Sequence, residues 1–129
     1  MKDKIINNLK KFNYNFSENK SEIIVRLHFS HSVIIKISED NKIVINDKLT
    51  HWNFLTGGIP MNLKNAMLYN FFGTIFFAMV CIYFKTKQSI FINTDLFLAY
   101  GIWIILFAGY YNLKLESFKQ QLSIWTSVE

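Results

Sequence analysis

The chain has 129 residues, which is room for one compact unit of about 60 residues and a membrane anchor but not for two large soluble domains. Half of its residues are apolar, 17% are aromatic and one is a proline, which excludes a disordered chain. The net charge of +5 comes from 13 Lys and one Arg, whereas nucleic-acid readers depend on Arg, so no nucleic-acid partner is expected. Cys81 is the single cysteine, which excludes an intramolecular disulfide.

Residues 1–49 are predicted to form a small soluble α+β domain. Ile5, Leu9 and Phe12 recur at helical spacing and predict an amphipathic helix over the first dozen residues. Residues 22–29 alternate as in a half-buried strand, with a turn expected at residues 30–32. Residues 33–37 and 43–45 predict two further strands, and a short one is expected near Tyr14 and Phe16. The expected fold is a helix on one face of a three- or four-stranded antiparallel meander.

Residues 50–65 are interpreted as an interfacial connector between this domain and the next helix. Trp52 and Phe54 favour a segment that lies among lipid headgroups, and Pro60 is typical of a helix start. The alternative is that these aromatic residues close the soluble core.

Two apolar segments predict a transmembrane hairpin. Residues 66–84 carry no charge and would span about 28 Å as a helix, close to the hydrocarbon thickness of a bilayer. Residues 94–111 form the second predicted span, with Asp95 near the positive end of the helix dipole. The connection at residues 85–93 is short, so the two helices must be antiparallel neighbours. Residues 112–129 continue a helical apolar stripe, and this amphipathic tail is expected to pack on the soluble domain, on a partner copy or along the membrane.

The distribution of lysine and aromatic residues predicts the orientation of the hairpin. Near the predicted spans, lysines are more numerous on the side of the two termini than in the connection. The opening residues also lack the apolar stretch of a signal peptide. Both termini are therefore expected in the cytoplasm, with the protein in a bacterial inner membrane and the connection outside. The aromatic residues expected at the membrane interface are Trp52, Phe54, Tyr69, Tyr83, Tyr110 and Tyr111.

Three histidines and two polar residues in the spans are the candidate sites. His28, His31 and His51 could ligate a metal, but no carboxylate or Cys stands at a familiar spacing, so surface or turn histidines are the simpler interpretation. Asp95 is interpreted as an end-of-helix residue, with a proton or ion relay as the alternative. Asn70 lies a turn inside the first span, where an amide needs a hydrogen-bond partner.

Small and polar residues on both spans predict close helix packing. They allow either packing within the hairpin or association of copies. The predicted packing residues are Asn70, Gly73, Thr74, Ala78, Gly101, Ala108 and Gly109.

No nucleophile motif, phosphate loop or paired carboxylate occurs in the sequence, so neither an enzyme nor a cofactor is expected. The sequence favours a membrane-anchored binding or adaptor module whose partners are the lipid bilayer and either another copy or another membrane protein. One alternative is an oligomerising membrane effector or pore gated by the cytosolic domain. Another is a small ion-coupled transport subunit that would use Asp95 or Asn70.

Overall fold

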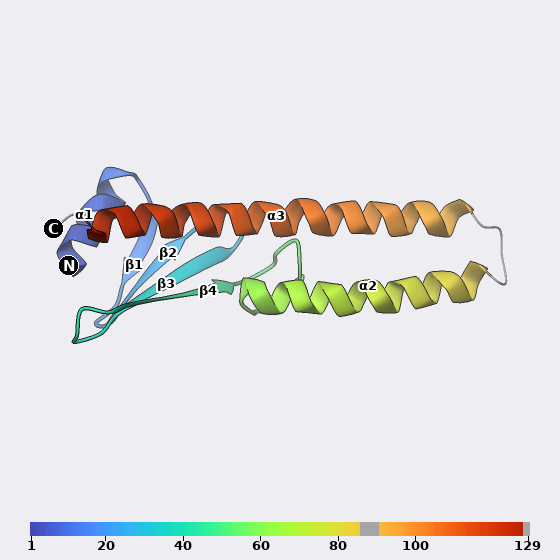
Figure 1. The fold of residues 1–129 in the computed structure, drawn as a ribbon, viewed down its shortest axis with the longest axis horizontal. Coiled ribbons are helices and arrows are strands. Elements are labelled where there is room, and N and C mark those ends of the chain that lie inside the picture. The colour runs from blue at the N-terminus through green and yellow to red at the C-terminus, as the bar shows by residue number, and fades with distance from the viewer. Residues whose placement is uncertain (86–90, 128–129) are drawn as a thin grey trace.

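The computed structural model describes residues 1–85 and 91–127. A small α+β unit lies at one end, and two long helices extend side by side away from it (Figure 1). Both termini lie at the end occupied by the α+β unit, which is the expected result when a chain leaves and returns along antiparallel helices. The connection predicted at residues 85–93 falls mainly on residues 86–90, which are outside the described residues.

The α+β unit consists of α1 (Lys2–Lys11) and four strands, β1 (Asn15–Glu18), β2 (Glu22–Arg26), β3 (His31–Ile37) and β4 (Ile43–Leu49). The strands form one antiparallel sheet in chain order, which confirms the predicted α+β layout. Ile35 pairs with Ile23 on one side and Ile45 on the other, so period-two alternation places these residues on a single face. That face is the core face of the sheet.

The turn between β2 and β3 lies earlier than predicted. β2 ends at Arg26, and Phe29 and Ser30 adopt left-handed backbone conformations with φ of 56° and 63°. The prediction of a strand that runs through Phe29 and a turn at residues 30–32 is therefore wrong. Ser32 pairs with Arg26 on one side and Lys48 on the other, so the predicted turn residues His31 and Ser32 belong to β3. As a consequence His31 begins β3 on the core face.

The two long helices are α2 (Leu63–Lys85) and α3 (Phe91–Ser127). Both are long and apolar enough to cross a membrane, and only 6% of the most apolar window of each is buried. Core helices of soluble proteins are mostly buried, so these windows do not belong to a protein interior. We call α2 together with residues 91–110 of α3 the helical pair.

Contacts within the helical pair are made by aromatic and small residues. The ring of Phe77 lies 5.1 Å from that of Tyr100 and 6.1 Å from that of Phe97. A Cβ atom added to Gly73 would lie 3.2 Å from the Tyr100 hydroxyl, so the glycine allows this close approach.

The C-terminal part of α3 completes the core of the α+β unit. One stripe of this helix packs on the sheet and on Ile5, Ile6 and Leu9 of α1. The stripe consists of Tyr111, Leu115, Phe118, Leu122 and Trp125, all buried. Of the three locations considered for the C-terminal tail, the structure shows the one on the α+β unit. One continuous helix therefore belongs both to the helical pair and to the core (Figure 1).

Candidate functional site

The connector predicted at residues 50–65 ends at residue 62, because α2 begins at Leu63, and the side chain of Asn53 holds it in a compact loop. Asn53 is 1% exposed, and its Oδ1 accepts hydrogen bonds from the backbone N–H groups of Leu55 at 3.0 Å and Thr56 at 2.8 Å. Its Nδ2 donates to the Thr56 hydroxyl at 2.8 Å and to the Gly57 carbonyl at 3.1 Å. Gly57 has a φ of +64°, a conformation that glycine adopts without strain. A loop of this kind can lie against apolar surface without leaving polar groups unpaired.

Two adjacent carbonyls of the connector each accept a hydrogen bond from the helical pair. The Trp103 indole N–H donates to the Phe54 carbonyl at 2.9 Å. The Asn70 amide donates to the Leu55 carbonyl at 2.9 Å and to the Ala66 carbonyl at 2.8 Å. These bonds give hydrogen-bond partners to the Trp103 indole and the Asn70 amide, which both lie in apolar stretches of the sequence. Both amide hydrogens of Asn70 are engaged, and the side chain is 5% exposed.

The sequence allowed two roles for the aromatic residues of the connector, a place among lipid headgroups or closure of the core, and the structure divides the residues between them. Phe54 stacks on Phe107 with ring centroids 4.3 Å apart and meets Trp103 edge-on. Leu55 is buried in the core, whereas Trp52 is 64% exposed. The connector therefore both closes the core and presents an aromatic surface.

A buried His31–Asp47 pair lies where the sheet meets both long helices. His31 Nε2 lies 3.0 Å from Asp47 Oδ2, and the same oxygen accepts the backbone N–H of Leu63, the first residue of α2, at 2.8 Å. A carboxylate only accepts hydrogen bonds, so Nε2 carries the proton. The ring of His31 meets Tyr111 edge-on at 5.6 Å, and the Tyr111 hydroxyl donates to the Phe29 carbonyl at 2.8 Å. The other ring nitrogen, Nδ1, is buried without a hydrogen-bond partner among the described residues.

The environment of Asp47 keeps its carboxylate charged. Burial raises the pKa, but the hydrogen bonds from His31 and from the Leu63 N–H outweigh burial, so the pKa lies below the usual value of 3.8. Lys119 contributes a further lowering by charge attraction. A carboxylate that accepts the N–H of a first helical residue is also favoured by the helix dipole.

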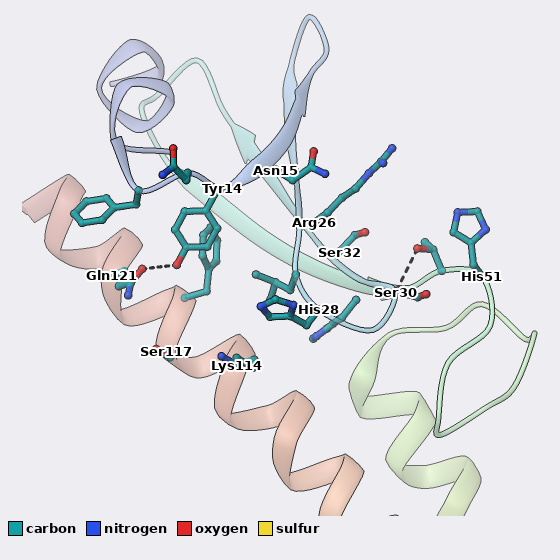
Figure 2. A pocket seen from close by; sticks show the side chains of 16 residues that line it. Tyr14, Asn15, Arg26, His28, Ser30, Ser32, His51, Lys114, Ser117 and Gln121 are labelled. Atoms are coloured by element: carbon teal, nitrogen blue, oxygen red, sulfur yellow. Dashed lines mark hydrogen bonds between the residues drawn. The ribbon is translucent and has the colours of Figure 1, made fainter. Parts of the chain in front are cut away.

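A cavity of about 720 Å³ opens beside this pair, between the rim of the sheet and the C-terminal part of α3 (Figure 2). We call it the basic cavity. Its lining residues are Phe12, Asn13, Tyr14, Asn15, Arg26, Leu27, His28, Ser30, His31, Ser32, Thr50, His51, Lys114, Ser117, Phe118 and Gln121. Two cationic side chains, three histidines and many hydroxyl and amide groups are among them, but none of these lining residues is acidic.

Hydrogen bonds hold two walls of the basic cavity in place. The Tyr14 hydroxyl donates to Gln121 Oε1 at 2.6 Å, which joins the N-terminal segment to α3 (Figure 2). Burial raises the pKa of Tyr14, so the hydroxyl remains a donor at neutral pH. On the opposite wall the Thr50 hydroxyl donates to the Ser30 carbonyl at 3.2 Å.

Two other depressions differ from the basic cavity in charge. One of about 270 Å³ lies between α2 and α3 and is lined by apolar side chains with Asn70 and Thr74. Another of about 520 Å³ has both signs of charge in its wall, because Asp47 and Glu116 stand beside Lys64 and Lys119. Of these three cavities, the basic cavity is distinguished by positive charge without acidic groups in its lining.

The three candidate metal ligands line one cavity but do not form a metal site. His28 and His51 are exposed, while His31 is 1% exposed and is neither a surface nor a turn residue. Residues 1–85 and 91–127 contain no group of three His, Cys, Asp or Glu side chains placed to hold a metal ion. Asp95 is exposed in the second turn of α3, at the end of the helical pair far from the sheet.

The predicted packing residues and interface aromatics lie at several places along the helical pair. Thr74 donates to the Asn70 carbonyl at 2.7 Å and lines the apolar depression with Ala108, and Ala78 is half-buried. A Cβ added at Gly101 or Gly109 would meet nothing within 4 Å. Among the predicted interface aromatics, Tyr69 and Tyr83 are exposed, Tyr110 is half-buried and Tyr111 belongs to the core.

Sequence reasoning did not single out Arg26, Lys114 or Asp47. A signal for Asp47 was present, because Ile43, Ile45 and Leu49 alternate and Asp47 occupies an inward position of the same series. A carboxylate on the inward face of a strand must find a partner, and His31 supplies it.

No protein-family profile, curated protein or solved structure matches the chain. The chemistry of the basic cavity therefore follows from its own lining. Cationic groups and hydroxyl and amide donors, in a lining without acidic residues, stabilise negative charge.

Proposed function

We propose that this protein is a membrane-anchored binding module. The helical pair crosses the bilayer, and the α+β unit, completed by the C-terminal part of α3, binds a ligand in the basic cavity. The observation that carries this proposal is that α3 supplies a wall of the basic cavity through Lys114, Ser117 and Gln121 and continues without interruption into the helical pair. Binding and anchoring thus use a single rigid element.

Exposed apolar surface supports the membrane part of the proposal. Phe72, Phe76 and Ile105 are each about two-thirds exposed, and similar side chains surround both helices. Exposing such a continuous apolar surface to water costs about 25 cal/mol per Å², and transfer into lipid removes that cost. The hydrogen bonds of the connector, within itself and from Trp103 and Asn70, suit the same setting, because lipid offers no hydrogen bonds to irregular backbone.

For the orientation, we propose that the α+β unit faces the cytoplasm of a bacterial cell and that the far end of the helical pair faces outward. The support is the excess of lysine beside the α+β unit, where Lys64 and Lys114 flank the apolar stretches.

Anchoring and orientation can be tested in cells with single-cysteine variants in a Cys81→Ser background. The chain is expected to resist extraction by alkaline carbonate. A membrane-impermeant maleimide is expected to label Asp95→Cys and not Asn46→Cys, an exposed position on β4. Extraction by carbonate would contradict anchoring, and the reverse labelling pattern would contradict only the orientation.

Ligand binding can be tested with the full chain in lipid nanodiscs exposed to a small-molecule extract of cells. Native mass spectrometry is expected to detect an adduct that Ser117→Trp removes by filling the basic cavity. Ser123→Trp is the matched control, because Ser123 is exposed on the same helix outside the cavity. Adducts that survive Ser117→Trp would show that binding occurs elsewhere.

An oligomerising effector is the second candidate, and the open space at Gly101 and Gly109 favours it. Glycines with free space beside them let another helix approach closely. A discrete oligomer in nanodiscs that Gly109→Leu dissociates would support this candidate over a monomeric anchor.

A further inference from the structure

We infer that the basic cavity binds a phosphate-bearing anion, either free in solution or as the headgroup of a lipid beside the protein. The inference rests on the proposed binding function and names the chemical class of the ligand. The lipid source additionally requires that the helical pair crosses a membrane.

The distribution of charge is the first argument. Arg26 from β2 and Lys114 from α3 both line the basic cavity (Figure 2), and its lining holds no carboxylate to neutralise them. No ion pair formed between described residues uses either cation; the Nζ of Lys114 instead lies 5.7 Å from the centre of the Tyr110 ring. Figure 2 shows Arg26 and Lys114 on different sides of the basic cavity, so an anion bound in it is attracted by positive charge from both sides.

The kinds of donor in the basic cavity point to phosphate. Arg26 is the single arginine in a chain with 13 lysines, and a guanidinium binds two phosphate oxygens at once. Hydroxyl groups of Ser32 and Ser117 and the amide of Asn15 supply neutral donors in the same lining. A tetrahedral anion with several oxygens can use such donors from several directions, whereas a cation would be repelled by Arg26 and Lys114.

His31 adds a buried nitrogen without a partner. The side chain lines the basic cavity, is 1% exposed, and has an Nδ1 atom with no hydrogen bond among the described residues. Buried polar atoms nearly always have partners, so an unpaired one beside a cavity points to a ligand atom or an ordered water. Phosphate can pair with Nδ1 whether the His31 ring is neutral or charged. A phosphate O–H donates to Nδ1 of the neutral ring, and a phosphate oxygen accepts from the Nδ1–H of the charged ring.

The position of the basic cavity favours lipid phosphate as the nearest source. Lys114 lies one helical turn beyond Tyr110, and the loops that contribute His28 and His51 also carry the half-exposed Phe29 and the exposed Trp52. Aromatic residues of this kind settle among headgroups when a neighbouring helix spans a bilayer. The basic cavity would then lie at the level of the lipid phosphates.

The test uses the full chain in nanodiscs of phosphatidylcholine, titrated with inorganic phosphate, and in nanodiscs that also contain phosphatidic acid. Phosphorus NMR line widths report the free anion, and native mass spectrometry reports retained lipid. Arg26→Gln and Lys114→Gln are each expected to weaken binding about tenfold, the effect of losing one charge-assisted hydrogen bond. Lys64→Gln is the matched control, because it removes a lysine beside the helical pair that does not line the basic cavity.

The source of the phosphate follows from whether the protein binds inorganic phosphate or retains phosphatidic acid. Saturable binding of inorganic phosphate indicates a soluble ligand, and retention of phosphatidic acid alone indicates a lipid headgroup. Absence of both, or equal weakening by Lys64→Gln, overturns the inference. Arg26→Lys keeps the charge and checks folding, since it should retain part of the affinity. A chain that resists carbonate extraction but binds neither phosphate refutes this inference alone, whereas a chain that binds phosphate but is extracted refutes only the anchor.

Discussion

The contribution of α3 to the core gives the sharpest prediction for stability. Phe118 is 2% exposed and lies between two aromatic rings, with centroids 5.3 Å from Tyr14 and 6.3 Å from Trp125. Replacing a buried phenylalanine by alanine removes its transfer free energy and leaves a cavity, at a cost of about 3–5 kcal/mol. Phe118→Ala should therefore lower the free energy of unfolding of the α+β unit by that amount.

Ile124→Ala is the control for this prediction. Ile124 lies on the same helix but is 62% exposed, so its replacement should change the free energy of unfolding by no more than about 0.5 kcal/mol. Both variants truncate an apolar side chain of the same helix to its Cβ atom, so the comparison tests the effect of burial.

Hydrogen exchange of the full chain in nanodiscs measures the effect locally. A loss of 3 kcal/mol or more should reduce the protection of amides in β2 and β3 by about a hundredfold or more. Amides of α2 that face lipid should keep their protection in both variants. If Phe118→Ala and Ile124→Ala reduced the protection of the strands equally, the C-terminal part of α3 would not complete the core.

Three further predictions concern a carboxylate, an amide and two glycines. The pKa of Asp47 in the folded protein lies below 3.8, so its charged form stabilises the fold above that pH and the contribution is lost as the pH falls through the folded pKa. The stability of Asp47→Asn should thus depend less on pH below neutrality than that of the unaltered chain, as measured by circular dichroism. The same pH dependence in both proteins would contradict this. Asn70→Leu leaves the Leu55 carbonyl without its donor and should destabilise the full chain by about 1–3 kcal/mol in thermal unfolding; an unchanged melting temperature would show another donor. Gly73→Leu should destabilise the helical pair by about 1–3 kcal/mol because it overpacks the contact with α3, whereas Gly109→Leu meets open space and should leave the same melting curve unchanged.

Local patterns in the sequence predicted most of the secondary structure. The alternation of Ile23, Val25, Val33 and Ile35 identified the core face of the sheet, and the uncharged run after Ala66 identified the first long helix. The turn before β3 was misplaced because left-handed conformations at Phe29 and Ser30 have no simple sequence signal.

The basic cavity could not be predicted, because its residues come from segments far apart in the chain. Arg26 and Lys114 line one cavity only after the sheet has formed and α3 has returned from the helical pair. The same holds for the hydrogen bonds from Trp103 and Asn70 to the connector, which join residues 49 and 15 positions apart. Periodicity describes one element at a time, whereas these contacts depend on how elements pack.

The return of α3 to the sheet also determines the order in which the protein can mature during synthesis. The ribosome makes the sheet before it makes residues 111–127, so the apolar face of the nascent sheet lacks its cover from α3 until those residues have been synthesised. The helical pair would therefore enter the membrane before the α+β unit closes. Val33, Ile35 and their neighbours would have to be shielded during that interval, and the docking of residues 111–127 on the sheet would be the step that completes the fold.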